Sequence, residues 1–399
     1  METALEIKSL PEGETALKNK MNSKAERNHG IDLLKVLAMF MVVVLHVLGQ
    51  GGVLGATAFL DPSHCMAWLL EIASFGAVNC FAIATGFLMV GRKIKYRRLV
   101  SMWLTVQFYN LLFFLLFHLQ KIPKLTLTDV SNFFPVYSGQ FWYFTAYFGL
   151  FLFIPFLNLL LEKMCKKQLF ALLLTGFIMF SVLFSFLGGV PFGMSGGYSI
   201  WWLMYLYFVG AAIAKFRFLR KTPPHLAFLG YMLCVAVTFG IRMLISYLSV
   251  NDFGELGKII IANASPHINY NAPLMTFGAI FFVIFCLNLR IPKIIGKVLA
   301  WMQPFVFQVY IIHLHPVIWK GVILHRFTEY AKASWYLLPL LVLGMALCIF
   351  VCCFLVDVVR HYLFKLLGID RLINFTADKS KAIYNRSKCK DMLDSFFVF

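Results

Sequence analysis

The stretch 28-NHGIDLLKVLAMFMVVVLHVLG-49 is an apolar run long enough to cross a bilayer, and it carries the ionisable residues Asp32, Lys35 and His46. Ionisable groups inside a membrane are costly, so each of them is a candidate functional residue. A helix turns about 100° per residue, and the step from Lys35 to His46 therefore places both side chains on one face, roughly 16 Å apart along the axis. A cation and an imidazole on one stripe suit a long substrate with an anionic head and a reactive tail.

The rest of the chain repeats this apolar character. It is 60% hydrophobic and only 14% charged over 399 residues, which excludes an ordinary soluble domain. The sequence predicts an all-α integral membrane protein with about ten transmembrane helices. They are expected at residues 31–49, 66–90, 99–118, 140–161, 168–188, 198–215, 226–249, 272–289, 297–319 and 336–367.

The basic residues predict how this chain is oriented. Of the 36 Lys and Arg residues, 28 fall in alternate connections and at the two ends, and only six fall in the remaining loops. Positive residues are retained on the cytoplasmic side, so both termini are expected to be cytoplasmic. The net charge of +18 then reflects topology and contact with anionic membrane lipids, and no nucleic-acid-binding module is present in the sequence.

One membrane domain accounts for most of the chain. We expect a cytoplasmic N-terminal lead over 1–28, the membrane domain over 29–368 and a basic cytoplasmic tail over 369–399. The pair His313-x-His315 lacks a carboxylate or cysteine at ligand spacing, so no metal site is expected. There is no Walker-type phosphate loop, which argues against an ATP-driven pump.

Five short patterns occur in a characteristic order. Lys35 is separated from His46 by ten residues, and the later patterns are 77-AVNCF-81 with 85-TGFL-88, 96-YRR-98, 141-FWYF-144 with Pro155, and 310-YIIH-313 with Pro316. Together they resemble the acyltransferase 3 family of integral membrane acyltransferases. The chain departs from the family pattern in having Lys35 where Arg is usual, Thr85 where Ser is commoner and Gln140 where many members have His.

The resemblance implies a function. The family moves acyl groups, most often acetyl, from a cytoplasmic thioester donor to hydroxyls of surface glycans or other extracellular acceptors. It therefore implies a plasma-membrane O-acyltransferase that uses acyl-CoA as donor substrate, has no permanently bound cofactor and acts on a cell-surface polysaccharide or a related glycan. The sequence does not indicate an oligomeric state.

Candidate donor-binding residues lie at the predicted cytoplasmic side. Lys35, Arg97 and Arg98 are expected to bind the phosphates of coenzyme A, and the pantetheine arm then reaches His46. His46 is expected to be the general base for the acceptor hydroxyl. Structural interpretations are also open: Lys35 as a snorkelling lysine, His46 as an interhelical hydrogen-bonding residue, and the arginines as topology signals.

Three further residues are candidates for the chemistry. Asp32 is expected either to pair with Lys35, one turn away, or to face the nucleotide. His313 is expected to stabilise an oxyanion or bind the acceptor, or else to contact headgroups at the helix end. Glu71 is expected either to fix the tautomer of His46 or to pair with Arg242.

The remaining candidates concern the acceptor. Trp142, Tyr143 and Arg242 are expected near the external side, where they could bind a glycan, although aromatic residues also gather at membrane interfaces for other reasons. A secondary transporter or a flippase for a sugar-linked or lipid-linked substrate is the alternative function, because such proteins also contain many spans and buried charges. The ordered motifs favour the acyltransferase.

Overall fold

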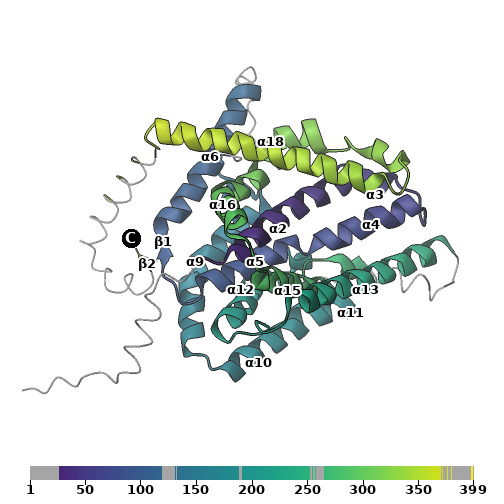
Figure 1. The fold of residues 1–399 in the computed structure, drawn as a ribbon, viewed down its shortest axis with the longest axis horizontal. Coiled ribbons are helices and arrows are strands. Elements are labelled where there is room, and N and C mark those ends of the chain that lie inside the picture. Colours follow the sequence, from purple (N-terminus) through teal and green to yellow (C-terminus); the bar gives the residue numbers. More distant parts are fainter. Residues whose placement is uncertain are drawn as a thin grey trace, which may run out of the picture.

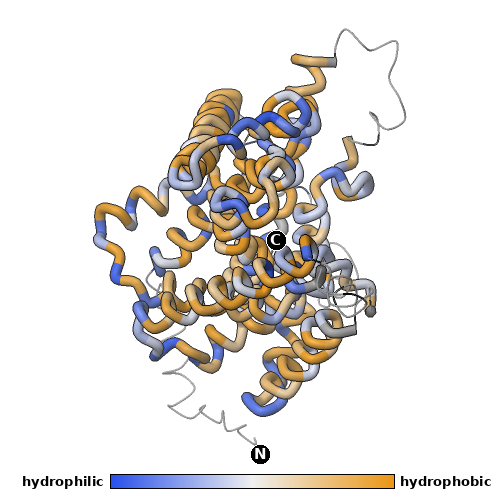
Figure 2. The backbone as a smooth tube through the Cα atoms, turned by 90° about the vertical axis from the view of Figure 1, so that its right-hand side faces the viewer, coloured by the Kyte–Doolittle hydropathy of each residue, from blue (hydrophilic) through white to orange (hydrophobic). Residues whose placement is uncertain are grey.

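The fold is a bundle of long apolar helices, seen here in a computed structural model (Figure 1). The structure describes residues 27–118, 131, 133–187, 191–251, 254, 257, 265–369, 371, 375, 379 and 397–398. Nearly all of the predicted N-terminal lead and most of the predicted tail lie outside these residues. Figure 2 shows that hydrophobic residues run along the helices, while hydrophilic residues gather mainly near their ends and connections.

The membrane helices confirm the predicted fold class. Within the described residues, eight helical segments are long and apolar enough to cross a membrane, and two shorter apolar helices occupy the other two predicted positions. Their bounds are α2 (His29–Leu48) with α3 (Val53–Ala56), α4 (Pro62–Phe75) with α5 (Ala77–Met89), α6 (Tyr96–His118), α9 (Trp142–Lys163), α10 (Lys166–Phe177) with η2 (Ile178–Val182) and α11 (Leu183–Leu187), α12 (Ile200–Lys215), α13 (Pro224–Val250), α15 (Pro273–Asn288), α16 (Lys293–His313) and α18 (Leu338–Leu366).

Shorter elements connect these helices. They are β1 (Ile94–Lys95), α8 (Pro135–Ser138), η3 (Pro191–Gly193), η4 (Ser195–Gly197), η5 (Ser265–Ile268), α17 (Pro316–Ile318), η6 (Trp319–Ile323), η7 (Thr328–Lys332) and β2 (Phe397–Val398). The two strands pair in parallel, with Ile94 opposite Phe397. This pairing holds the C-terminal end beside the basic connection between α5 and α6.

Helix α2 occupies the centre of the bundle (Figure 1). It begins at the N-cap Asn28, whose side-chain oxygen accepts hydrogen bonds from the backbone N–H groups of Gly30 and Ile31 at 2.9 and 3.3 Å. It packs against α4, α5, α15, α16 and α18. A helix surrounded in this way can hold a reactive side chain away from lipid.

A close helix pair fixes α12 against α5. A Cβ atom added at Gly86 would lie 2.1 Å from the Tyr207 carbonyl oxygen, and one added at Gly210 would lie 2.0 Å from the Ile83 carbonyl oxygen. The two backbones therefore touch where both helices carry glycine, as is common in membrane bundles.

Candidate active site

Two histidines meet at the C-terminal end of α2. His46 of α2 and His313 of α16 are 267 residues apart in the chain, but His46 Nδ1 lies 2.9 Å from His313 Nε2. His313 is completely buried, and its Nδ1 lies 2.5 Å from the Val309 carbonyl oxygen. The rings of Trp319 and His46 pack nearly at right angles to each other, with 5.4 Å between ring centroids.

These contacts assign the protons of both neutral rings. The Val309 carbonyl can only accept, so His313 Nδ1 carries the hydrogen and donates it. His313 Nε2 then has a lone pair and accepts a hydrogen bond from His46 Nδ1–H. His46 Nε2 is left unprotonated, which is the form a general base needs. The partner that sets this tautomer is His313, whereas the sequence led us to consider Glu71 for that role.

A cavity of about 450 Å³ lies beside His46. The residues that line it come from α2, α4, α5, α9 and α16 and from the segments around these helices. Its lining is Met39, Val42, Leu45, His46, Gln50, Glu71, Phe75, Val78, Phe81, Gln140, Trp142, Tyr143, Tyr198, Tyr270, Phe307, Tyr310, Leu314, Pro316, Trp319 and Lys320. The candidates His46, Glu71, Trp142 and Tyr143 are therefore brought together around one space.

Several buried polar atoms of this lining are available to a ligand. Glu71 Oε2, Gln140 Oε1 and the Tyr143 hydroxyl are each shielded from solvent and have no hydrogen-bond partner in the described part of the chain. Buried polar groups normally have partners. Their position on one cavity fits a polar substrate.

Tyr310 adds a donor that the sequence indicated only as part of a motif. Its hydroxyl oxygen accepts a hydrogen bond from the backbone N–H group of Tyr143, at 3.2 Å, in the first turn of α9. The O–H hydrogen of Tyr310 is not needed for this bond. A helix N-terminus favours negative charge, so this hydroxyl is polarised as a donor.

An aromatic wall closes another side of the cavity. Trp142 lies 4.6 Å from Tyr198 and 5.7 Å from Tyr270, measured between ring centroids. Burial raises the pKa of the Tyr270 hydroxyl, which therefore remains protonated at neutral pH. Tyr198 belongs to none of the sequence patterns, because an aromatic residue at a helix start is also expected in an interfacial belt.

The basic residues predicted to bind the donor lie at the other end of α2. Lys35 is partly buried and has no hydrogen bond or ion pair with any described residue; the attraction of the Asp32 charge acts on it more strongly than the repulsion of Arg98. Arg97 and Arg98 are exposed. Lys35 lies on the same face as Met39, one turn away, and Met39 lines the cavity.

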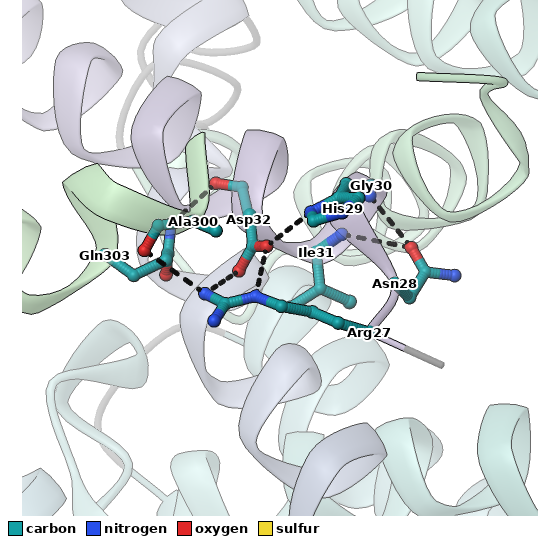
Figure 3. Close-up of polar contacts among 8 residues, drawn as sticks. All are labelled: Arg27, Asn28, His29, Gly30, Ile31, Asp32, Ala300 and Gln303. Atoms are coloured by element: carbon teal, nitrogen blue, oxygen red, sulfur yellow. Dashed lines mark hydrogen bonds and ion pairs between the residues drawn. The ribbon is translucent and has the colours of Figure 1, made fainter. Parts of the chain in front are cut away.

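Asp32 does not pair with Lys35; its carboxylate contacts Arg27 and His29, which precede it in the chain (Figure 3). Its carboxylate accepts hydrogen bonds from Arg27 Nε at 2.7 Å and Nη2 at 2.9 Å, and lies 3.2 Å from His29 Nδ1. The hydrogen bond to the Asp32 carboxylate raises the pKa of the Arg27 guanidinium. The Asp32 carbonyl accepts from Gln303 Nε2 of α16 at 2.9 Å.

This network ties the start of α2 to α16. Asp32 lies fourteen residues before His46, roughly 21 Å along the helix, so the two do not share a reaction centre. The hydrogen bonds of Asp32 therefore support a structural role, whereas the sequence suggested a role in the chemistry.

Glu71 and Arg242 do not form the ion pair that was one expectation. The Arg242 guanidinium lies over the Trp68 ring, 3.9 Å from its centroid, and it is not part of the cavity lining. No group of three or more potential metal ligands occurs in the ranges that the structure describes.

The sequence patterns and the comparisons agree. A family model described as an acyltransferase domain matches residues 28–358, which is most of the chain. No curated protein and no solved structure matches it. The family decides between the two function classes in favour of acyl transfer over transport. This chain belongs to the acyltransferase 3 family of membrane acyltransferases.

Proposed function

We propose that the protein is a plasma-membrane O-acyltransferase that moves an acyl group, most simply acetyl, from cytoplasmic acyl-CoA to a hydroxyl of a cell-surface glycan. One observation carries this proposal. The chain of contacts from the Val309 carbonyl through His313 to His46 leaves His46 Nε2 as an unprotonated nitrogen on a cavity wall.

In the proposed reaction His46 acts as general base. The acceptor O–H donates to His46 Nε2, and the hydroxyl oxygen attacks the thioester carbonyl as the proton moves to the imidazole. When the carbon–sulfur bond breaks, His46 returns this proton to the departing thiolate. Acceptor ester and free thiol are formed, and the enzyme ends in its starting protonation state. His313 is a positioning residue in this scheme.

Tyr310 supplies a donor for the oxyanion. The attack places negative charge on the former thioester carbonyl oxygen, and fixed donors aimed at this charge lower the barrier. The Tyr310 hydroxyl suits the role because the backbone N–H group of Tyr143 already donates to its oxygen. The Tyr143 hydroxyl on the same cavity is a second donor.

In the proposed reaction, the acyl donor and the acceptor enter the cavity from opposite ends. The cavity wall contains Met39, Val42 and His46 on one face of α2, and Lys35 follows on that face. The apolar part accommodates the pantetheine arm and acyl group, while Lys35, Arg97 and Arg98 bind the anionic end of the donor. The aromatic wall and Glu71 bind the acceptor, because sugar rings pack on aromatic faces and their hydroxyls bond carboxyl oxygens.

Label transfer tests the proposal. Cells producing the intact chain, His46→Ala or His315→Gln at equal membrane abundance are supplied with labelled acetyl groups, and label in the surface glycan is measured. We expect label with the intact chain and His315→Gln, and a loss of at least about 100-fold with His46→Ala. Equal labelling by His46→Ala would contradict the role of His46, and absence of label from the intact chain would contradict the acetyl donor or the glycan acceptor.

A further inference from the structure

A second polar cluster lies between α4 and α13, outside the cavity. It contains Trp68 of α4 and Arg242 and Ser246 of α13, and we name it the Arg242 cluster. Arg242 Nε, Trp68 Nε1 and Ser246 Oγ are buried atoms that have no hydrogen-bond partner within the described ranges. Ser246 is one turn after Arg242, so both side chains project from the same side of α13.

No carboxylate among the described residues balances the charge of this cluster. Arg242 makes no ion pair with any carboxylate that the structure describes, and its recorded partner is the face of the Trp68 ring. A guanidinium inside a membrane span is costly unless an anion compensates it. All three unpartnered groups can donate hydrogen bonds, which fits an anion with several acceptor oxygens.

The position of Arg242 indicates where this anion comes from. Arg242 is eighteen residues after Pro224, the first residue of α13, which is roughly 27 Å along the helix and close to the thickness of a hydrocarbon core of about 30 Å. In the predicted orientation α13 begins at the cytoplasmic side, so Arg242 is near the outer headgroups. Its neighbours Ile241, Leu244 and Tyr247 are 36%, 56% and 48% exposed, as on a lipid-facing surface.

We propose that the Arg242 cluster binds the phosphate group of a lipid in the outer half of the membrane. Arg242 provides a planar fork of donors and the charge, since guanidinium groups match phosphate oxygens well. Trp68 N–H and the Ser246 hydroxyl provide further donors. The phosphate can belong to bulk phospholipid or to a lipid-linked acceptor; Glu71, one turn after Trp68 on α4, already reaches the cavity.

Lipid binding to the purified full-length protein tests this site. Native mass spectrometry in detergent measures retention of phosphatidylglycerol, of polyprenyl phosphate and of diacylglycerol, which lacks the phosphate. We expect the intact chain to retain the phosphate lipids and not diacylglycerol. Arg242→Gln should weaken retention about tenfold or more, and Ser246→Ala several-fold. The control Arg326→Gln removes an exposed arginine from an external loop and should change nothing.

The outcomes separate the possible sources of the phosphate. Equal retention of both phosphate lipids supports a phospholipid site, and a preference for polyprenyl phosphate supports a lipid-linked acceptor. If Arg242→Gln does not fold, Arg242→Lys keeps the charge without the fork and should weaken retention several-fold. Retention unchanged in Arg242→Gln or in the substitute Arg242→Lys, or equal retention of diacylglycerol, would overturn the proposal.

Discussion

At the scale of single residues, the tautomer of His46 controls its chemistry. Only a hydrogen-bond acceptor at His46 Nδ1 leaves the lone pair on Nε2, and His313 provides that acceptor. Histidine in water populates both tautomers, so the buried pair replaces a mixture by one form.

The first prediction concerns His313. His313→Phe removes the acceptor and should lower kcat roughly 10²–10⁴-fold with a small change in the KM for the donor. His313→Gln can both donate to the Val309 carbonyl and accept from His46, so it should restore part of the rate. Steady-state kinetics on membrane vesicles measures both parameters. A full rate in His313→Phe, or no recovery in His313→Gln, would contradict the positioning role.

The second prediction concerns Glu71. Glu71 is 8% exposed as a residue, and its buried Oε2 has no partner among the described residues, a condition that costs about 1–3 kcal/mol or more. Glu71→Gln should therefore raise the melting temperature in detergent while increasing the KM for the acceptor. The matched control Glu162→Gln changes an exposed carboxylate and should leave both unchanged. A lower melting temperature in Glu71→Gln would show that the carboxylate serves the fold.

At the scale of helices, a buried ion pair joins α18 to α6. Asp357 Oδ1 accepts from Arg360 Nε and from the Tyr109 hydroxyl, each at 2.6 Å, and Arg360 Nη2 donates to Asp357 Oδ2 at 3.0 Å. Asp357 is completely buried. The sequence alone does not indicate this pair, because Asp357 and Arg360 lie near the end of a long apolar run.

The third prediction concerns this pair. Asp357→Asn leaves the Arg360 charge buried without its partner and should destabilise the protein by about 3–5 kcal/mol. Glu329→Gln, in an exposed pair with Lys332, should cost about 0–1 kcal/mol. Melting temperature and yield of folded protein give the comparison. A similar loss of stability in the two variants would show that the Asp357–Arg360 pair does not stabilise the helix bundle.

The fourth prediction concerns the contact between α5 and α12. Gly210→Ala places a Cβ 2.0 Å from the Ile83 carbonyl oxygen and must push the two backbones apart. Overpacking of this kind costs about 1–3 kcal/mol or more. Gly344→Ala in α18 meets no atom within 4 Å and should be tolerated. A Gly210→Ala protein as stable as the Gly344→Ala protein would mean that the close approach is not required.

At the scale of the whole molecule, the distribution of positive charge still predicts an orientation. The fifth prediction places Cys165, which is exposed between α9 and α10, on the cytoplasmic side. A membrane-impermeant maleimide should label it in inside-out vesicles and not in right-side-out vesicles. Cys165→Ser identifies its share of the label. Cys165-dependent label in right-side-out vesicles, and none in inside-out vesicles, would contradict the predicted orientation. Lys35 would then lie at the external end of α2, away from cytoplasmic acyl-CoA.

Hydropathy and short motifs were enough to predict the helical membrane fold and the family. Hydropathy is a local property, so each predicted span contains an apolar helix, and the ordered motifs from Lys35 to His313 are matched by the family model. The alignment of Lys35 with His46 also follows from helix geometry alone.

Which side chains meet depends on how the helices pack. His46 and His313 come from helices far apart in the sequence, and nothing local to either residue predicts their contact. Lys35 and His29 each lie three residues from Asp32 on α2, so spacing does not distinguish them as partners. In the folded chain, where α16 packs against this end of α2, the Asp32 carboxylate contacts His29 and Arg27. Helix periodicity gives the direction of a side chain, whereas its partner depends on which helix packs there.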